Sequence, residues 1–130
     1  MKKLAVALLS CLLLMVTATW ARIIRVRFPP GRTTVVLKGK TTGGPSESGG
    51  MDPIAYRLRA RKGQQMNLNL VSAKNNAVLG VYLPGIDLLE GAQNVKSWSG
   101  PLPKSGDYEI IVFPEDEMTD TTFTLEISIR

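Results

Sequence analysis

The sequence contains no histidine and a single cysteine, Cys11, in 130 residues. Without histidine, the chain lacks the usual base of Ser-His and Cys-His nucleophile pairs and the commonest ligand of zinc. Cys11 lies in an N-terminal segment that we expect to be removed, so the mature protein has no thiol for disulfides or for thiol catalysis. Carboxylates, lysines and hydroxyls are the side chains left for chemistry.

The first 21 residues have the three parts of a secretory signal. Lys2 and Lys3 form the charged start, Leu4–Val16 is the apolar run, and Thr17–Ala21 has the small residues of a cleavage site. The run is shorter than the ~20 apolar residues that a membrane span needs. We expect cleavage after this segment, a periplasmic or secreted bacterial protein, and one mature domain of residues 22–130.

The net charge of the whole sequence is +5. Two of the positive charges leave with the signal, and the remaining excess is mild. A nucleic-acid-binding protein carries a strong, clustered basic surface, so we expect no nucleic-acid partner. The positive excess would still attract an acidic partner.

The rest of the chain reads as short strands separated by turns. Apolar and polar residues alternate in most segments, as strands with one buried face require, and no segment shows helical periodicity. The predicted strands are 23–28, 33–40, 54–61, 65–72, 78–83, 102–113 and 122–129, and segment 86–95 remains ambiguous. Seven or eight strands at this spacing predict an all-β fold, an antiparallel β-sandwich.

The segment 102–113, with the sequence LPKSGDYEIIVF, joins a turn to a strand. Gly106 adopts positive φ at little cost, so a tight turn is expected just before Tyr108. From there Tyr108, Ile110 and Val112 share one face, by the period of two that strands obey. The short loop that results is either a structural corner or a finger that enters the cleft of another protein.

Three groups of acidic residues are candidates for chemistry. Asp87 with Glu90, or Asp107 with Glu109, would be the pair of carboxylates that a glycosidase needs, but carboxylates on a small sandwich more often face solvent. The acidic segment Glu115–Asp120 lacks the Asp-x-Asp-x-Asp-Gly spacing of a calcium loop. We therefore expect a binding protein without a metal or cofactor, not an enzyme.

A basic stripe is predicted along one strand, where Arg57, Arg59 and Arg61 alternate with apolar residues. Such a stripe is either the ordinary solvated face of a sheet or a surface for an acidic partner or an anionic glycan. The composition favours the solvated face.

The larger aromatic residues outside segment 102–113 are Tyr56, Tyr82 and Trp98. Together they are candidates for stacking on sugar rings, since an aromatic ring offers a large apolar face. Alternation places Tyr56 on the apolar side of its strand, which favours the core. Trp98 lies between two serines in a loop-like context, and it is the best candidate for an exposed ring.

The order of these landmarks resembles the periplasmic inhibitors of g-type lysozyme over most of the predicted mature chain. The resemblance rests on VRFPPGRTTVVLKGK, YRLRARKGQQMNLNL, VYLPGID and LPKSGDYEIIVF. The last of these contains the Ser-Gly-x-Tyr form of a loop motif that inhibitors of several lysozyme types share. The resemblance implies a loop that enters the active-site cleft of a g-type lysozyme. It places Lys104, Ser105, Gly106, Asp107 and Tyr108 at that interface.

The same landmarks also resemble the pre-peptidase C-terminal sandwich domains. Those modules have a Gly-Gln strand opening, here Gly63-Gln64, and a Leu-Pro-x-x-Gly-x-Tyr corner, here Leu102–Tyr108. They usually accompany a protease domain, so export, small size and a lone domain favour the inhibitor. The alternative is a secreted module that binds glycan or protein without inhibiting an enzyme.

Two features of the sequence bear on this resemblance. The segment PEDEMTDT before the last strand is acidic where the inhibitors are generally basic, and an acidic flank weakens binding to an acidic cleft. Tyr108 has two interpretations: its hydroxyl bonds back to the backbone as a tyrosine corner, or it contacts lysozyme. For Ser105, at the tip of the turn, the binding role is favoured.

Overall fold

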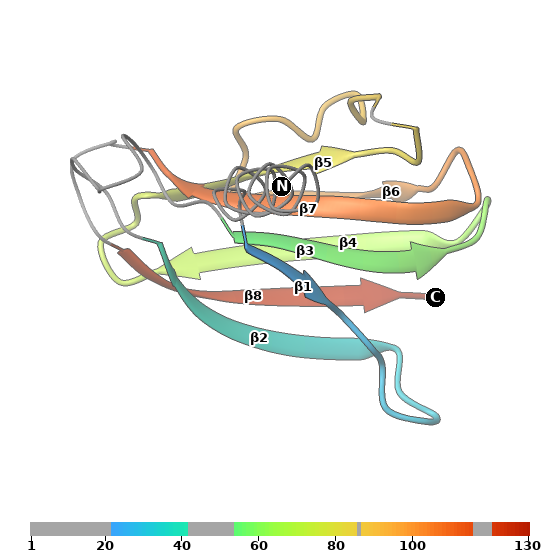
Figure 1. Cartoon of the computed structure of the whole chain (residues 1–130), viewed down its shortest axis with the longest axis horizontal. Coiled ribbons are helices and arrows are strands. Elements are labelled where there is room, and N and C mark those ends of the chain that lie inside the picture. Colours follow the sequence, from blue (N-terminus) through green and yellow to red (C-terminus); the bar gives the residue numbers. More distant parts are fainter. Residues whose placement is uncertain (1–21, 42–53, 86, 116–120) are drawn as a thin grey trace, which may run out of the picture.

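The computed structural model describes residues 22–41, 54–85, 87–115 and 121–130 (Figure 1). These residues form eight strands and no helix, and so no helix that could cross a membrane occurs among them. The strands are β1 (Arg22–Arg25), β2 (Thr34–Thr41), β3 (Ile54–Ala60), β4 (Gln65–Ser72), β5 (Ala77–Tyr82), β6 (Ser97–Pro101), β7 (Gly106–Pro114) and β8 (Thr121–Ile129). The predicted signal and residues 116–120 of the acidic segment lie outside the described residues.

The strands form two four-stranded sheets that pack face to face (Figure 1). The first sheet has the order β1-β3-β7-β5 and the second the order β2-β8-β4-β6. The predicted β-sandwich is confirmed. One pair differs from the antiparallel expectation, because β1 runs parallel to β3. The chain leaves β1 for the second sheet instead of turning back in a hairpin, so nothing forces β1 to run antiparallel to its neighbour.

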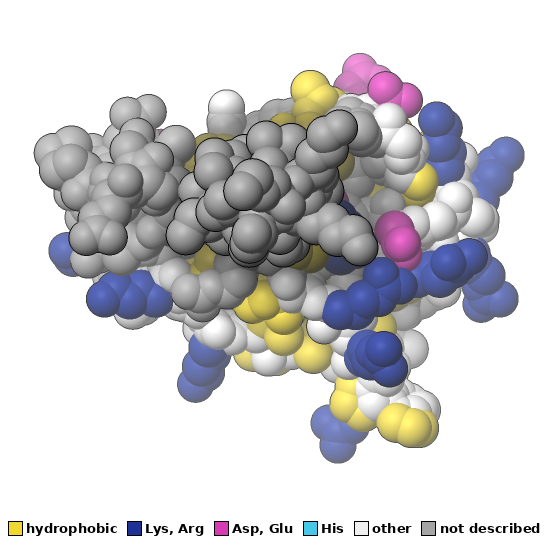
Figure 2. Space-filling model, viewed as in Figure 1, with side chains coloured by type: hydrophobic (Ala, Val, Ile, Leu, Met, Phe, Trp, Pro, Cys, Tyr) yellow, Lys and Arg dark blue, Asp and Glu magenta, His cyan; other side chains and the backbone are white. Residues whose placement is uncertain are grey.

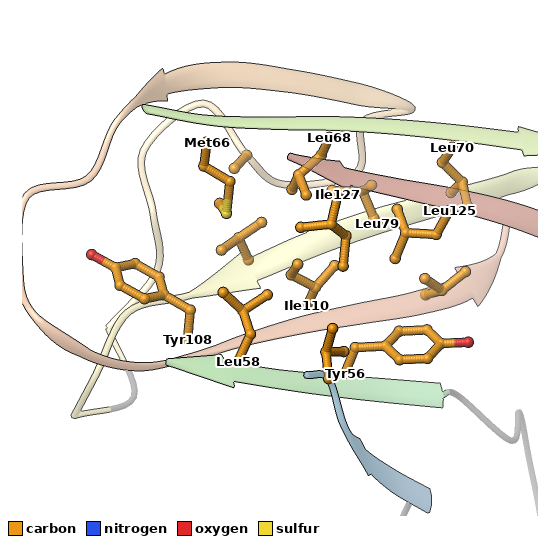
Figure 3. Close-up of a cluster of buried hydrophobic side chains, with 14 of the residues drawn as sticks. Tyr56, Leu58, Met66, Leu68, Leu70, Leu79, Tyr108, Ile110, Leu125 and Ile127 are labelled. Atoms are coloured by element: carbon orange, nitrogen blue, oxygen red, sulfur yellow. The ribbon is translucent and has the colours of Figure 1, made fainter. Parts of the chain in front are cut away.

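The core fills the space between the sheets with the alternate side chains of each strand (Figure 3). In β7, Tyr108, Ile110 and Val112 are completely buried while the residues between them are partly exposed, which confirms the predicted alternation. Tyr56 is also buried, as predicted. Each aliphatic side chain taken fully out of water stabilises the fold by about 1.5–3 kcal/mol.

Strand β6 was not predicted, and the segment before it is a loop. Within SWSGP the one large apolar residue is Trp98, so the sequence shows no alternation. The structure pairs Trp98 with Leu68 of β4 and packs the indole, half-buried, against the core. Trp98 is therefore not the exposed ring that its flanking serines suggested.

The beginning of the chain also differs from the sequence pattern. The alternation predicted a strand over 23–28 with Ile24, Val26 and Phe28 on one face. Strand β1 ends at Arg25, Val26 is buried, and Ile24 is 37% exposed. An edge strand of four residues has only β3 as a partner, so it covers little of its own side chains.

Gly39 of β2 lies where the rings of Tyr56 and Phe123 meet edge to face. A Cβ at this position would come within 2.5 Å of the Phe123 ring and 2.9 Å of the Tyr56 hydroxyl. We expect Gly39→Ala to lower the free energy of unfolding by about 1–3 kcal/mol, the usual cost of overpacking. Urea denaturation measures it. The control, Lys38→Ala on the exposed side of β2, should stay within about 0.5 kcal/mol. Equal stability of the two variants would contradict this packing.

Candidate functional site

Three connections meet at one end of the sandwich, on the right in Figure 1. They are the turn 61–64 between β3 and β4, residues 83–85 after β5, and the loop 102–105 between β6 and β7. We call this the loop end. Backbone hydrogen bonds join two of these connections: Gly63 donates to the Leu102 carbonyl and Leu102 donates to the Gln64 carbonyl, both at 2.8 Å. The loop that the sequence singled out is thus held by a second turn.

Tyr108 closes this loop from the inside. Its ring is completely buried at the end of the core (Figure 3). Its hydroxyl donates to the Lys104 carbonyl oxygen at 2.6 Å and accepts the Lys104 N–H at 3.2 Å. Burial raises the pKa of the Tyr108 hydroxyl, and the hydrogen bond to Lys104 opposes that rise. This is the geometry of a tyrosine corner, so the side chain has no exposed surface in the free protein.

Ser105 is held from the outside. Its side chain is exposed, and its Oγ accepts the backbone N–H of Lys62 at 2.8 Å. A hydroxyl has one donor and two acceptor positions. The bond to Lys62 uses an acceptor position and leaves the hydrogen of the Ser105 hydroxyl available to a partner.

Gly106 and Lys104 contact residues that follow β5. Gly106 has φ +142°, and a Cβ there would lie 2.9 Å from the Pro84 ring, so this position requires glycine. The Lys104 ammonium lies 3.7 Å from the Asp87 carboxylate, and both side chains are more than half exposed. The loop end is therefore packed through Pro84 and presents a cation at its surface.

Asp107 and Glu109 point to the outer face of the first sheet. Arg25 lies 3.3 Å from Asp107, and Arg57 lies 3.7 Å from Glu109. These carboxylates are thus each paired with an arginine of the same sheet, Arg25 on β1 and Arg57 on β3. No cluster of three or more histidine, cysteine, aspartate or glutamate residues that could hold a metal occurs in the described part of the chain.

The predicted basic stripe lies on this same outer face. Arg57 is half-buried, whereas Arg59 and Arg61 are exposed. In Figure 2, lysine and arginine side chains gather at the loop end. The sequence identified the stripe and the loop separately, but their proximity follows from the pairing of β3 with β7, which sets Arg59 opposite Asp107.

No protein-family model matches the chain, and no curated protein matches it. Solved structures do match. The periplasmic lysozyme inhibitor of g-type lysozyme from Aeromonas hydrophila is 28% identical, with a TM-score of 0.69, over 85% of this chain and 97% of that one. The chain shares the fold of a g-type lysozyme inhibitor. The corresponding inhibitor from Salmonella Typhimurium is 23% identical, with a TM-score of 0.63, over 85% of this chain and 100% of that one.

The second resemblance also has a structural counterpart. The pre-peptidase C-terminal domain of a Bacillus anthracis collagenase is 16% identical, with a TM-score of 0.52, over 85% of this chain and 95% of that one. At this identity the likeness concerns the fold alone. The chain is more similar to the inhibitor from A. hydrophila than to this collagenase domain, in sequence and in structure.

The closure of the loop by Tyr108 can be measured with Tyr108→Phe, which removes the hydroxyl and keeps the ring. We expect the free energy of unfolding at pH 7 to fall by about 0.5–1.5 kcal/mol, the net contribution of one hydrogen bond. Denaturant unfolding of the two proteins provides the comparison.

The same two proteins should differ in their response to alkaline pH. Burial raises the pKa of Tyr108 above the value of about 10 that an unfolded chain has. The unfolded state then loses this proton first, so the wild-type protein loses the contribution as the pH rises above about 10. The stability difference between wild type and Tyr108→Phe should shrink there. Parallel pH curves for the two proteins would contradict the assignment.

Proposed function

We propose that the protein is an exported inhibitor of a g-type lysozyme and that the loop Lys104–Tyr108 enters the active-site cleft of that enzyme. Similarity to the A. hydrophila inhibitor over nearly its whole length supports the activity. The mechanism is supported by one observation: the exposed loop Lys104–Tyr108 already has a fixed backbone in the free protein. Tyr108 fixes the loop from inside, and the 61–64 turn fixes it from outside.

Fixing the loop in advance makes binding more favourable. A mobile loop loses side-chain and backbone freedom when it enters a cleft, at about 0.5–1.5 kcal/mol for each immobilised side chain. Here Ser105 is already bonded to Lys62, and Gly106 already packs on Pro84. Much of the ordering has thus occurred on folding, and more of the contact energy remains for affinity.

The exposed groups of the loop suit a lysozyme cleft, which presents carboxylates because two of them are needed to cleave a glycosidic bond. The free hydrogen of the Ser105 hydroxyl can donate to a carboxylate, and a charged acceptor strengthens that hydrogen bond. The exposed Lys104 ammonium adds a positive charge beside it. Asp107 is paired with Arg25, which limits its repulsion of an acidic cleft.

Tyr108 has a supporting role in this mechanism. Its ring is buried and its hydroxyl is bonded on both sides to Lys104, so it sets the position of Lys104 and Ser105 without reaching the enzyme itself. Of the five residues of the loop, we therefore assign contact with lysozyme to Lys104, Ser105 and Gly106. Asp107 lies at the edge of the contact, and Tyr108 lies behind it.

We infer the cellular role of the protein from its expected location in the periplasm. The two related inhibitors are periplasmic proteins. With its predicted signal removed after residue 21, this chain would reach the same compartment. There it would protect peptidoglycan from a g-type lysozyme that has crossed the outer membrane.

A lysis assay tests the activity. Purified protein of residues 22–130 is mixed with g-type, c-type and i-type lysozymes, and the clearing of cell-wall suspensions is followed. We expect micromolar protein to slow the g-type enzyme, with no lytic activity of its own. If no lysozyme is slowed, the chain is instead a sandwich module that binds glycan or protein without inhibition.

A bulky residue at the loop tip tests the mechanism. Ser105→Tyr should leave the protein folded and lower the free energy of unfolding by no more than about 0.5–1.5 kcal/mol, because the side chain is exposed and the substitution removes one hydrogen bond, the one to Lys62. It should weaken inhibition at least about tenfold, since a loop that fills a cleft has no room for a ring. The matched control is Ser97→Tyr, which places the same ring on exposed β6, at the end of that strand away from the loop. Full inhibition by folded Ser105→Tyr would show that another surface binds the enzyme.

A further inference from the structure

A groove of about 390 Å³ lies on the outer face of the first sheet, beside the loop. Strand pairing places Arg57 of β3, Glu109 of β7 and Tyr82 of β5 in one row across it. Leu83 and Ile111 also line the groove. One side of the groove is therefore aromatic and aliphatic, and the other is charged.

The charged residues that line the groove are all in ion pairs. Arg57 pairs with Glu109 at 3.7 Å, and Arg25 pairs with Asp107 at 3.3 Å. A charged ligand of either sign would meet repulsion, because an anion would lie beside the Asp107 and Glu109 carboxylates and a cation beside the Arg57 guanidinium. A neutral ligand meets no such repulsion and can still hydrogen-bond, because a guanidinium with five N–H donors and a carboxylate with about four acceptor positions keep unused positions when they pair once.

The apolar side of the groove adds a second requirement. Tyr82 is half-buried and lines the groove together with Leu83 and Ile111. Aromatic rings favour contact with flat apolar surfaces. The ligand must then combine an apolar face with hydroxyl groups around its edge.

We propose that this groove binds a neutral sugar ring, a hexopyranose of a glycan, as a second site that adjoins the inhibitory loop and shares Asp107 with it. The C–H face of the sugar lies on Tyr82, and its hydroxyls bond to Arg57 and Glu109. The volume is at the small end of the 300–1,000 Å³ range for ligand sites, which suits a short sugar unit and not a long enclosed chain.

The three aromatic residues that were candidates for sugar stacking lie in different places in the structure. Tyr56 is buried in the core, and Trp98 packs against the core from β6. Tyr82 alone among the three lines the groove.

The experiment is an amide NMR titration of the mature protein, without lysozyme, using N-acetylglucosamine, its β-1,4-linked dimer, glucose and galactose. We expect saturable shifts around Tyr82, Glu109 and Ile111 with at least one of these sugars. Tyr82→Ala should weaken binding at least about tenfold, while Tyr82→Phe, which keeps the ring, should retain most of it. The dispersion of each spectrum shows that the variant is folded.

Two further variants locate the polar side. Arg57→Gln should weaken sugar binding, whereas Arg61→Gln, an exposed arginine outside the groove, should not. Ser105→Tyr should bind sugar like the wild type, so loss of inhibition and loss of sugar binding can be told apart. No saturable shift with any of the four sugars would overturn the proposal. Binding that survives in both folded Tyr82→Ala and folded Arg57→Gln would also overturn it.

Discussion

The hydrogen bonds between the Tyr108 hydroxyl and the backbone of Lys104 determine the shape of the loop end. The ring that carries this hydroxyl is completely buried and fills the end of the core. Its hydroxyl satisfies both polar groups of the Lys104 peptide backbone, which would otherwise depend on water. Core packing and loop shape therefore depend on the same side chain, because the Tyr108 ring cannot leave the core without breaking the hydrogen bonds that hold the loop.

Each residue of the Ser-Gly-x-Tyr motif satisfies a different physical requirement. Tyr108 acts from inside, and Gly106 allows contact with Pro84, where a side chain would collide. Ser105 bonds outward to Lys62 of the neighbouring turn and keeps its hydrogen free. In this motif the fold requires Gly106 and Tyr108, whereas Ser105 lies at the surface. This explains why it is compatible both with an inhibitor and with a sandwich module of another function.

Period-two alternation was enough to predict most strands, the burial of Tyr56, and the face that Tyr108 shares with Ile110 and Val112. Alternation could not predict β6, because Trp98 is the one large inward-facing residue of that strand. Strand β6 forms through its pairing with β4. The loop residues were also predictable, because glycine and a following strand define the turn locally. Their partners were not. Lys62 lies 43 residues before Ser105, and only the folded topology brings that N–H to the Ser105 hydroxyl.

Strand β7 links the two surfaces that we assign to binding. Its inward residues belong to the core, its first residue ends the loop, and its outward residues Asp107 and Glu109 line the groove. The ion pairs on that outer face are partly exposed, and such pairs contribute about 0–1 kcal/mol each to stability. The fold therefore depends little on these charges, and substitutions can change the binding properties of the face without unfolding the sandwich. Because β7 is paired on both sides, with β3 and β5, the loop and the groove stay at a fixed separation. A partner that contacts both surfaces must match that spacing, whereas a small sugar and an enzyme cleft can each use one surface alone.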